Sequence, residues 1–481
     1  MIEASTFKGQ TIAVFGLGRS GISSALSLQA GGAKVLAWDD HAGTRDRAAA
    51  LGVKLTDLTG YDWTQIDELV LSPGVPHELP QAHWSAEAAK KAVVPIICDI
   101  EIFAREVAAR APERRPKIIA ITGTNGKSTT TSLIGHILKE CGRDAQIGGN
   151  IGRGVLDLDP MHRGAFYVLE LSSYQLERTY SLKANAAVFL NLTPDHLDRH
   201  GDMKSYEKAK LRVFDNQVAS DAAIIGVDSP EGKSICTRLI SANNRRVLPI
   251  SGRRSLGRGV CVIKSKLYNV MDKTCEKVVD LSRAIGLDGE HNWQNASAAF
   301  AVVRSLGLDA NDIGNALLNF PGLEHRLENI GSIGSAKFVN DSKATNADAC
   351  AQALKTYDNI YWIAGGQAKE GGIENLSPHF KNITRAYLIG EAAEDFHETL
   401  KAEKIPSKIS GELRMAILCA TRDALASKSV NPVILLSPAC ASFDQFKNFE
   451  IRGDAFRGHA VEIIEIYERE RASANMQQGA A

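Results

Sequence analysis

The chain has 481 residues, enough for about three domains, and it is 44% hydrophobic and 23% charged, with 56 Lys and Arg against 56 Asp and Glu. The balanced charge argues against a nucleic-acid-binding protein, and the absence of a long uncharged apolar stretch argues against a membrane-spanning one. The eight cysteines are scattered without a Cys-x-x-Cys pair, which favours reduced, mostly buried thiols and predicts a cytoplasmic α/β protein.

The first predicted elements form a nucleotide-binding unit. A strand at residues 11–15 leads into Gly16-Leu17-Gly18-Arg19-Ser20-Gly21 and a helix, and a second strand at 33–38 ends at Asp39-Asp40. A glycine-rich turn between strand and helix, followed by an acid after the next strand, is typical of this unit. Taken alone, the pattern also fits an NAD-dependent dehydrogenase.

The first segment continues with a strand at residues 69–71 that runs into Ser72-Pro73-Gly74. The charged, proline-bearing residues 105–116 then predict a linker.

A phosphate-binding loop opens the second segment. A strand at 117–121 precedes Thr122-Gly123-Thr124-Asn125-Gly126-Lys127-Ser128, and apolar residues at helical spacing follow it. Glycines let the backbone close around a triphosphate, and the amides at a helix start point at its oxygens. Lys127 can reach the outer phosphates and Ser128 can hold Mg²⁺. The extra glycine stands at Gly123 rather than five residues before Gly126, but the loop still predicts ATP binding.

Two later strands of this segment end in polar residues. Glu170 closes an apolar strand at 166–170, and His196 follows another at 187–192. Because ligands of α/β sheets bind at the carboxyl ends of strands, Glu170 suits a Mg²⁺ ligand. His196 could be a metal ligand, a positioned polar group or an ordinary loop histidine. Lys210, within a helix predicted at 204–214, is indicated by the sequence alone to be a solvated lysine.

After short strands at about 247–282 and a helix at 290–305, the third segment alternates strands with helices. Its strands are predicted at 337–340, 360–364, 386–389 and 433–436. The polar stretch 340–346 fits either a helix cap or a ligand contact. Cys440 has no partner that would make it a nucleophile.

Together these strings resemble the Mur ligases, the ATP-dependent amide-forming enzymes of peptidoglycan synthesis. The loop at 122–128 is the family's variant phosphate loop. Further matches are Gly148–Gly152, Glu170–Ser173, Asp195–Asp198, His291–Asn295, His325-Arg326 and Asn340–Asn346. Residues 436–450 and the N-terminal glycine-rich unit are similar to the member that adds D-glutamate to UDP-N-acetylmuramoyl-L-alanine.

The resemblance implies three α/β domains. They are an N-terminal Rossmann-like domain at 1–105 for the UDP-linked substrate, a central P-loop domain with a mostly parallel sheet at 106–320, and a Rossmann-like C-terminal domain at 321–481 for the incoming amino acid. It also implies a cytoplasmic monomer that uses ATP and Mg²⁺, with two ions.

The resemblance further implies a set of ligand-binding residues. For ATP they are Gly123, Thr124, Asn125, Gly126, Lys127, Ser128, Thr129, Asn295, Arg326 and Asp341; for the UDP-linked substrate Gly18, Arg19, Ser20, Asp39, Asp40, Ser72, Pro73, Gly74, Asn150 and Ser172; for D-glutamate Thr345, Lys369, Ser442 and Phe449. Ser128, Glu170 and His196 are implied as metal ligands. In the family the lysine that matches Lys210 is carbamylated by CO₂, so Lys210 is implied as a further ligand.

The implied reaction activates the L-alanine carboxylate of the UDP-sugar as an acyl phosphate, which the amine of D-glutamate then attacks. Two alternatives remain open at this point. One is the sister ligase that adds L-alanine to UDP-N-acetylmuramic acid, and the other is a Rossmann dehydrogenase with an appended domain. A non-catalytic nucleotide-binding regulator is disfavoured by the complete catalytic set.

Overall fold

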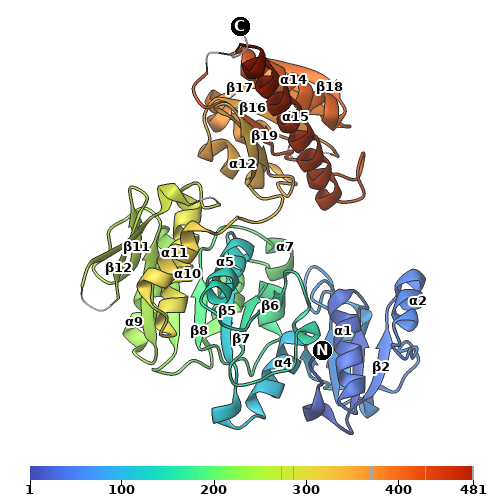
Figure 1. The fold of residues 1–481 in the computed structure, drawn as a ribbon. Helices are drawn as coiled ribbons and strands as arrows, with labels where there is room; N and C mark the ends of the chain where they lie inside the picture. Colours follow the sequence, from blue (N-terminus) through green and yellow to red (C-terminus); the bar gives the residue numbers. More distant parts are fainter. Residues whose placement is uncertain (272–273, 285, 368–371, 428, 479–481) are drawn as a thin grey trace. The chain divides into compact units, whose positions relative to one another are not determined.

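The computed structural model describes residues 1–271, 274–284, 286–367, 372–427 and 429–478. The chain divides into two compact units, Met1–Leu318 and Asn319–Ala481. Three sheets, each flanked by helices, are drawn in Figure 1. The predicted α/β class with mostly parallel sheets is confirmed, whereas the three-domain division at residues 105 and 320 stays a prediction.

The first sheet has four parallel strands in the order β2-β1-β3-β4. Its strands are β1 (Thr11–Phe15), β2 (Lys34–Trp38), β3 (Glu68–Leu71) and β4 (Ile96–Ile97), and its helices are α1 (Arg19–Ala30), α2 (Ala42–Ala50), α3 (Trp84–Lys91) and α4 (Asp99–Ala108). The buried apolar residues of β1 form the centre of this sheet. The turn of residues 16–18 therefore lies at the carboxyl edge, where a nucleotide-binding unit binds its ligand.

The second sheet has nine strands in the order β13-β12-β11-β10-β9-β8-β5-β7-β6. The strands are β5 (Lys117–Thr122), β6 (Ala145–Gly149), β7 (Phe166–Glu170), β8 (Ala186–Phe189), β9 (Ala222–Gly226), β10 (Arg246–Ser251), β11 (Gly259–Ile263), β12 (Lys266–Val270) and β13 (Glu276–Asp280). β11, β12 and β13 pair antiparallel, and the other strands pair parallel. β5 thus lies between β7 and β8, so the ends of these three strands are neighbours.

The helices of the second sheet are α5 (Lys127–Glu140), α6 (Ser173–Glu177), α7 (Leu197–His200), α8 (Met203–Leu211), α9 (Pro230–Ala242), α10 (Glu290–Ser305) and α11 (Ala310–Leu318). Figure 1 shows α5, α10 and α11 together over one face of the sheet. One hydrophobic core contains residues of the first two sheets, among them Val14 and Tyr167, together with residues of the helices and turns around them, such as Phe103 and Leu156. This shared core explains why the first 318 residues form one unit.

Unit 2 contains a six-stranded sheet in the order β14-β15-β19-β16-β17-β18. Its elements are β14 (Glu328–Ile333), β15 (Ala336–Asn340), α12 (Ala347–Thr356), β16 (Ile360–Gly365), β17 (Ile383–Ile389), α13 (Ala393–Ala402), β18 (Ser407–Gly411), α14 (Leu413–Ala426), β19 (Val433–Leu436) and α15 (Phe449–Gln478). Among the described strands of this sheet, only β14 runs antiparallel to its neighbour. Its cores lie on the two faces of this sheet.

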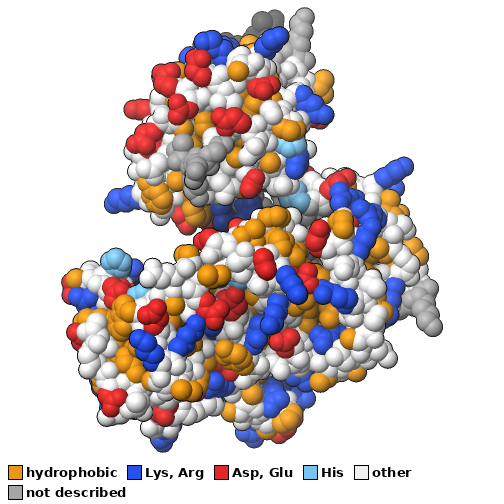
Figure 2. Space-filling model, turned by 180° about the vertical axis from the view of Figure 1, so that it is seen from behind, with side chains coloured by type: hydrophobic (Ala, Val, Ile, Leu, Met, Phe, Trp, Pro, Cys, Tyr) orange, Lys and Arg blue, Asp and Glu red, His pale blue; other side chains and the backbone are white. Residues whose placement is uncertain are grey.

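The surface carries both signs of charge. On the face drawn in Figure 2, acidic and basic side chains are interspersed, in keeping with the balanced composition. Among the described residues, no helix has the length and apolar character needed to cross a membrane. The cysteines are free thiols and most of them are buried, as predicted.

The linker predicted at residues 105–116 is wrong in its first part. Helix α4 continues to Ala108, and Arg105 donates to Glu68 at 2.5 Å and to Glu101 at 2.9 Å. The charged residues that suggested a linker are paired instead: Glu106, which is 6% exposed, accepts from the Ser5 hydroxyl and the Thr6 amide.

Candidate active site

The phosphate loop joins β5 to α5, as predicted, and its shape requires glycine. Gly123 and Gly126 have φ angles of 146° and 84°, which favour glycine. A Cβ on Gly126 would lie 2.5 Å from Oδ1 of Asn295. Asn295 therefore lies directly against the loop, where its amide also bonds Thr130 and Asn292.

Asn191, which sequence reasoning missed, lies two residues after β8 and holds the phosphate loop. Its Oδ1 accepts from the Asn125 amide at 2.9 Å, and its Nδ2 donates to the Asn125 carbonyl at 3.1 Å. Its backbone carbonyl accepts from the Thr124 amide at 3.1 Å. A single polar residue after an apolar run was the signal that could have found it.

Two lysines converge on the carbonyl of Gly123. Lys127 Nζ donates to this oxygen at 3.0 Å and to that of Thr124 at 2.8 Å, and Lys210 Nζ donates to Gly123 at 2.8 Å. The predicted phosphate-binding lysine and the lysine near the end of α8 are therefore neighbours, and the loop carries a concentrated positive charge.

The prediction from the sequence alone that Lys210 is a solvated lysine is wrong. Its side chain is buried, at 1% residual exposure, and the ammonium lies 4.4 Å from the ring centre of Tyr206. Burial lowers the pKa of Lys210 to about 7, and the nearby charge of Lys127 adds to the effect. Part of its amine is thus neutral at neutral pH, and only a neutral amine can react as a nucleophile.

Glu170 ends β7 beside the phosphate loop. It is 3% exposed, and its Oε1 accepts from Nδ2 of Asn150 at 2.9 Å. The other carboxylate oxygen is buried without a hydrogen-bond partner in the described part of the chain. A buried carboxylate oxygen without a donor is costly unless a cation or ligand satisfies it.

His196 lies at the start of α7 in a left-handed backbone conformation with φ 55°. Its Nε2 is 3.3 Å from Asp195, and its ring is 5.0 Å from that of Tyr174. Burial lowers the pKa of His196, although Asp195 opposes the shift, and the charges of Lys210 and Lys127 add to it. A neutral imidazole is the form that ligates a metal.

These groups fit Mg²⁺ in part. Within the described ranges, no three acids, histidines or cysteines gather closely enough to hold a metal by themselves. Mg²⁺ is usually bound by one or two carboxylates together with phosphate oxygens and water. The unsatisfied oxygen of Glu170 beside the phosphate loop fits that donor set.

The residues predicted for the UDP-linked substrate meet from three parts of unit 1. Arg19 donates to the Gly152 carbonyl at 2.6 Å, which brings the first glycine-rich turn beside the turn that carries Asn150. The Ser72 hydroxyl donates to the Gly16 carbonyl at 2.5 Å. These two hydrogen bonds bring the glycine-rich turn after β1 beside Gly152 and beside Ser72.

The acids after β2 have different surroundings. Asp39 accepts from the amides of Leu17 and His41 at 2.7 and 2.9 Å, so it fixes the glycine-rich turn. Asp40 accepts from the Trp84 indole at 3.2 Å and lies 3.0 Å from the His83 ring. Gly18, Ser20, Pro73 and Gly74 contribute backbone to the same edge, and Ser172 caps α6.

Unit 2 carries the remaining predicted residues. Asp341 follows β15 and accepts from the Ser437 hydroxyl at 2.8 Å and from the Leu327 amide at 3.3 Å. Burial raises the pKa of Asp341 to about 7, which the hydrogen bond from Ser437 and the charge of Arg326 oppose. Nε of Arg326 is buried without a partner among the described residues.

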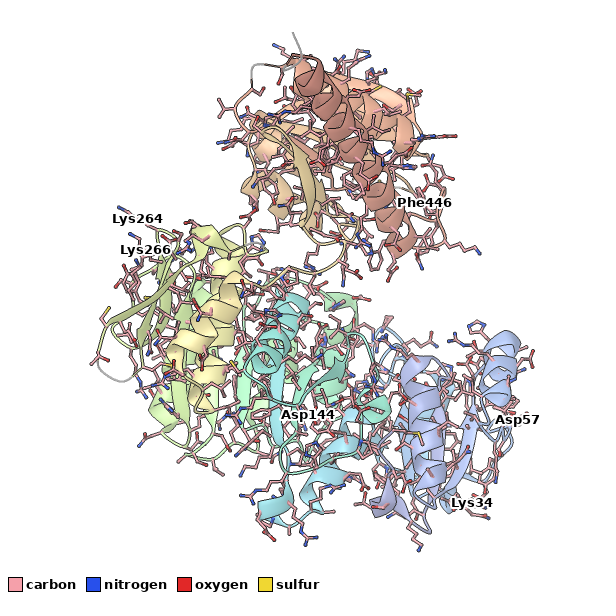
Figure 3. All side chains as sticks on the ribbon, viewed as in Figure 1. Lys34, Asp57, Asp144, Lys264, Lys266 and Phe446 are labelled. Atoms are coloured by element: carbon pink, nitrogen blue, oxygen red, sulfur yellow. The ribbon has the colours of Figure 1, made fainter. Side chains whose placement is uncertain are left out.

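The D-glutamate residues predicted in unit 2 come from two neighbouring loops. Thr345 precedes α12, and Phe449 is the first residue of α15. Ser442 is buried, with 2% of its surface exposed. Figure 3 labels Phe446, which lies in the loop just before α15. Lys369 lies outside the described residues. Asn346 caps α12, so a helix cap accounts for that residue of the stretch 340–346.

Buried Arg452, which sequence reasoning missed, joins these loops. It is 1% exposed and donates to the hydroxyl and carbonyl of Ser342 at 3.0 and 2.9 Å. It also donates to the carbonyls of Cys440 and Ala441 at 3.1 and 3.3 Å. Burial raises the pKa of the Cys440 thiol to about 12, in agreement with the prediction that it is no nucleophile.

Comparisons with known proteins identify relatives of this chain. The family model of the Mur ligase middle domain matches residues 121–303. A relative from Caulobacter sp. (strain K31), named UDP-N-acetylmuramoylalanine--D-glutamate ligase, is 53% identical over 457 residues, covering 95% of this chain and 97% of its own. A relative of the same name from Rhizobium meliloti (strain 1021) is 49% identical over 463 residues, covering 96% and 98%.

Solved structures share the fold. UDP-N-acetylmuramate-alanine ligase from Thermotoga maritima gives a TM-score of 0.54 at 18% identity, covering 96% of this chain and 99% of its own. The structure of UDP-N-acetylmuramoyl-L-alanyl-D-glutamate--2,6-diaminopimelate ligase gives a TM-score of 0.54 at 17% identity. The match covers 95% of this chain and 94% of that one.

Proposed function

This chain belongs to the Mur ligase family, and from that premise we propose that it adds D-glutamate to UDP-N-acetylmuramoyl-L-alanine, with hydrolysis of ATP to ADP and phosphate. The observation that carries the proposal is the close similarity to D-glutamate ligases along almost the whole chain. The sister L-alanine ligase is disfavoured, because its solved relative shares far less of the sequence. The dehydrogenase alternative is wrong for a member of a ligase family.

The proposed reaction has two steps. The L-alanine carboxylate attacks the γ-phosphoryl group of ATP, which forms an acyl phosphate and releases ADP. The amine of D-glutamate then attacks the acyl carbon, and phosphate leaves as the amide forms. Lys127, at the phosphate loop, would neutralise the charge that develops on the transferred group.

We propose Ser128, Glu170 and His196 as residues that hold Mg²⁺, together with Lys210 as its carbamate. When bound, the ion would supply positive charge to the phosphoryl oxygens. The free oxygen of Glu170 supports its part in this set. Each unit would bind a different one of the other ligands. The residues predicted for UDP lie in unit 1, and those predicted for D-glutamate lie in unit 2. We expect a cytoplasmic monomer.

Carbamylation joins the neutral amine of Lys210 to the carbon of CO₂ and releases one proton, giving N–COO⁻. The burial of this lysine beside Tyr206 supports the proposal, because it favours the neutral amine. With ¹³C-bicarbonate, we expect a protein-bound carbamate signal in the ¹³C spectrum that Lys210→Met removes. Lys208→Met, which changes an exposed lysine of the same helix, should keep the signal. A signal that persists in Lys210→Met would contradict the assignment.

The activity itself is tested by phosphate release from ATP in the presence of UDP-N-acetylmuramoyl-L-alanine. Release should depend on D-glutamate and not occur with L-glutamate or L-alanine. Lys127→Ala should lower the rate of phosphate release at least about a hundredfold, because it removes a hydrogen-bond donor that stabilises the charge developing in the transition state. Lys139→Ala, at the exposed end of the same helix, is the matched control and should remain active. Release with L-alanine and UDP-N-acetylmuramic acid instead would assign the chain to the sister ligase.

A further inference from the structure

Five successive backbone carbonyls, starting at the last residue of β3, accept hydrogen bonds from two arginines. Arg178 donates to the carbonyls of Leu71, Ser72 and Pro73 at 2.9, 3.3 and 3.2 Å. Arg199 donates to those of Gly74 and Val75 at 3.2 and 3.4 Å. The loop of residues 71–75 includes Ser72, Pro73 and Gly74, which are predicted to contact the UDP-linked substrate. Two guanidinium groups therefore fix the whole backbone of a predicted substrate loop.

Arg178 is the more deeply buried of the two. It is 1% exposed, and its Nε donates to the Tyr174 carbonyl at 3.2 Å. Among the described residues, its hydrogen bonds all end on backbone carbonyls, and burial lowers its pKa. A buried guanidinium without a bonded carboxylate is costly. Its planar fork, however, can reach several carbonyls at once, which a lysine cannot do.

Both arginines come from segments that also carry predicted metal ligands. Arg178 ends the short helix α6, which starts soon after Glu170, and Arg199 lies in α7, three residues after His196. The Arg199 guanidinium also lies 4.5 Å from the ring centre of Tyr174. The substrate loop of the first sheet is thus tied to the same short segments that border the phosphate loop of the second sheet.

We propose that Arg178 and Arg199, which we call the arginine clamp, are positioning residues for the ligase reaction. By fixing the loop of residues 71–75, the clamp would set the distance between the UDP-linked substrate and the phosphoryl group. A displacement of about 1 Å in a bound reactant can cost about a hundredfold in rate, so this tie has a direct effect on catalysis. The inference rests on the proposed function for its substrate.

Kinetics separate this role from a purely structural one. We expect Arg178→Met to raise the KM for UDP-N-acetylmuramoyl-L-alanine and to lower kcat, each about tenfold or more, because the loop that positions this substrate loses hydrogen bonds from a charged group. The KM values for ATP and D-glutamate should stay within about twofold, because Arg178 donates to the loop and to Tyr174, and none of these residues is predicted to bind those two ligands. Arg178→Lys should recover only part of the effect, because it keeps the charge without the fork. Arg199→Met, at a half-buried site, tests the same loop should Arg178→Met fold poorly.

Arg212 provides a matched control. It donates to the carbonyls of Leu176 and Thr179 at 2.9 and 2.8 Å and lies 4.9 Å from the ring centre of Tyr180. It therefore supports α6 and its end in the same chemical way, but among the described residues its hydrogen bonds end on Leu176 and Thr179 rather than on the loop. Arg212→Met should lower thermal stability without separating the three KM values.

Calorimetric titration with UDP tests the clamp without the ligation reaction. UDP should bind more weakly to Arg178→Met than to the wild type and equally to Arg212→Met. If the wild type releases no phosphate but UDP binding follows this pattern, the clamp stands and the proposed function fails. If the wild type is active and the variants change all three KM values together, or none, the clamp is overturned.

Discussion

At the scale of single residues, Asp341 gives unit 2 an unusual dependence on pH. Its pKa rises from 3.8 to about 7 because the carboxyl group is buried, although the Ser437 hydroxyl donates to it. Between these pH values the folded chain keeps a proton that the unfolded chain releases. The contribution of protonated Asp341 to the free energy of unfolding is therefore complete below about pH 4, and it is lost as the pH rises through about 7.

Asp341→Asn should remove this dependence, because the amide is neutral at all these pH values and the Ser437 hydroxyl can accept from it. We expect the stability difference between the variant and the wild type to be smaller at pH 5 than at pH 8, because the wild type has lost only part of this contribution at pH 5. Between pH 5 and pH 8 the variant should gain on the order of 3 kcal/mol in stability relative to the wild type, because about two pKa units of the shift lie in this range at about 1.4 kcal/mol each. Thermal unfolding at the two pH values measures the difference.

Asp423→Asn is the control of opposite sign. Burial opposes the shift, but the hydrogen bonds from Arg422 and Tyr387 prevail and lower the pKa of Asp423. Its contribution is present above about pH 4 and is lost on acidification, so this variant should be less stable than the wild type at pH 8. An equal difference between wild type and Asp341→Asn at pH 5 and pH 8 would refute the role of Asp341.

At the scale of elements, apolar pattern and turn chemistry predicted the central strands and the glycine-rich turns. The helix predicted at 290–305 has the bounds of α10, and the strand predicted at 11–15 has those of β1. Elements at the sheet edge of unit 2 were missed. β18 has the sequence Ser-Lys-Ile-Ser-Gly and contains only half-buried and exposed residues, so it lacks the apolar run by which buried strands are recognised.

Contacts between distant segments set the second limit on prediction. The phosphate loop is a local motif, so its lysine and serine could be named from the sequence. Asn191 reaches Asn125 across 66 residues, and Arg178 reaches Leu71 across 107. A hydrogen bond between a side chain and a distant backbone group produces no recognisable residue spacing in the sequence, because the two groups meet only in the folded chain.

At the scale of the whole molecule, the two units have separate cores, and this should show in their response to ligands. The core of unit 1 includes residues of the first two sheets, whereas the cores of unit 2 contain only residues after Leu318. The residues predicted for UDP all lie in unit 1. A ligand that binds only the folded state at about 100 times its Kd stabilises that state by about 2.7 kcal/mol.

We therefore expect UDP to slow hydrogen–deuterium exchange in peptides of β1, β3 and β5 without changing those of β15, β16 and β19. Peptide-resolved mass spectrometry measures this directly, because amide exchange reports the local free energy of opening. D-glutamate, whose predicted residues lie in unit 2, is the reciprocal control and should protect that unit alone. Equal protection of both units by UDP would mean that they unfold as one cooperative body. The shared core of unit 1, which joins the first sheet to the second, predicts that any such coupling stops at Leu318.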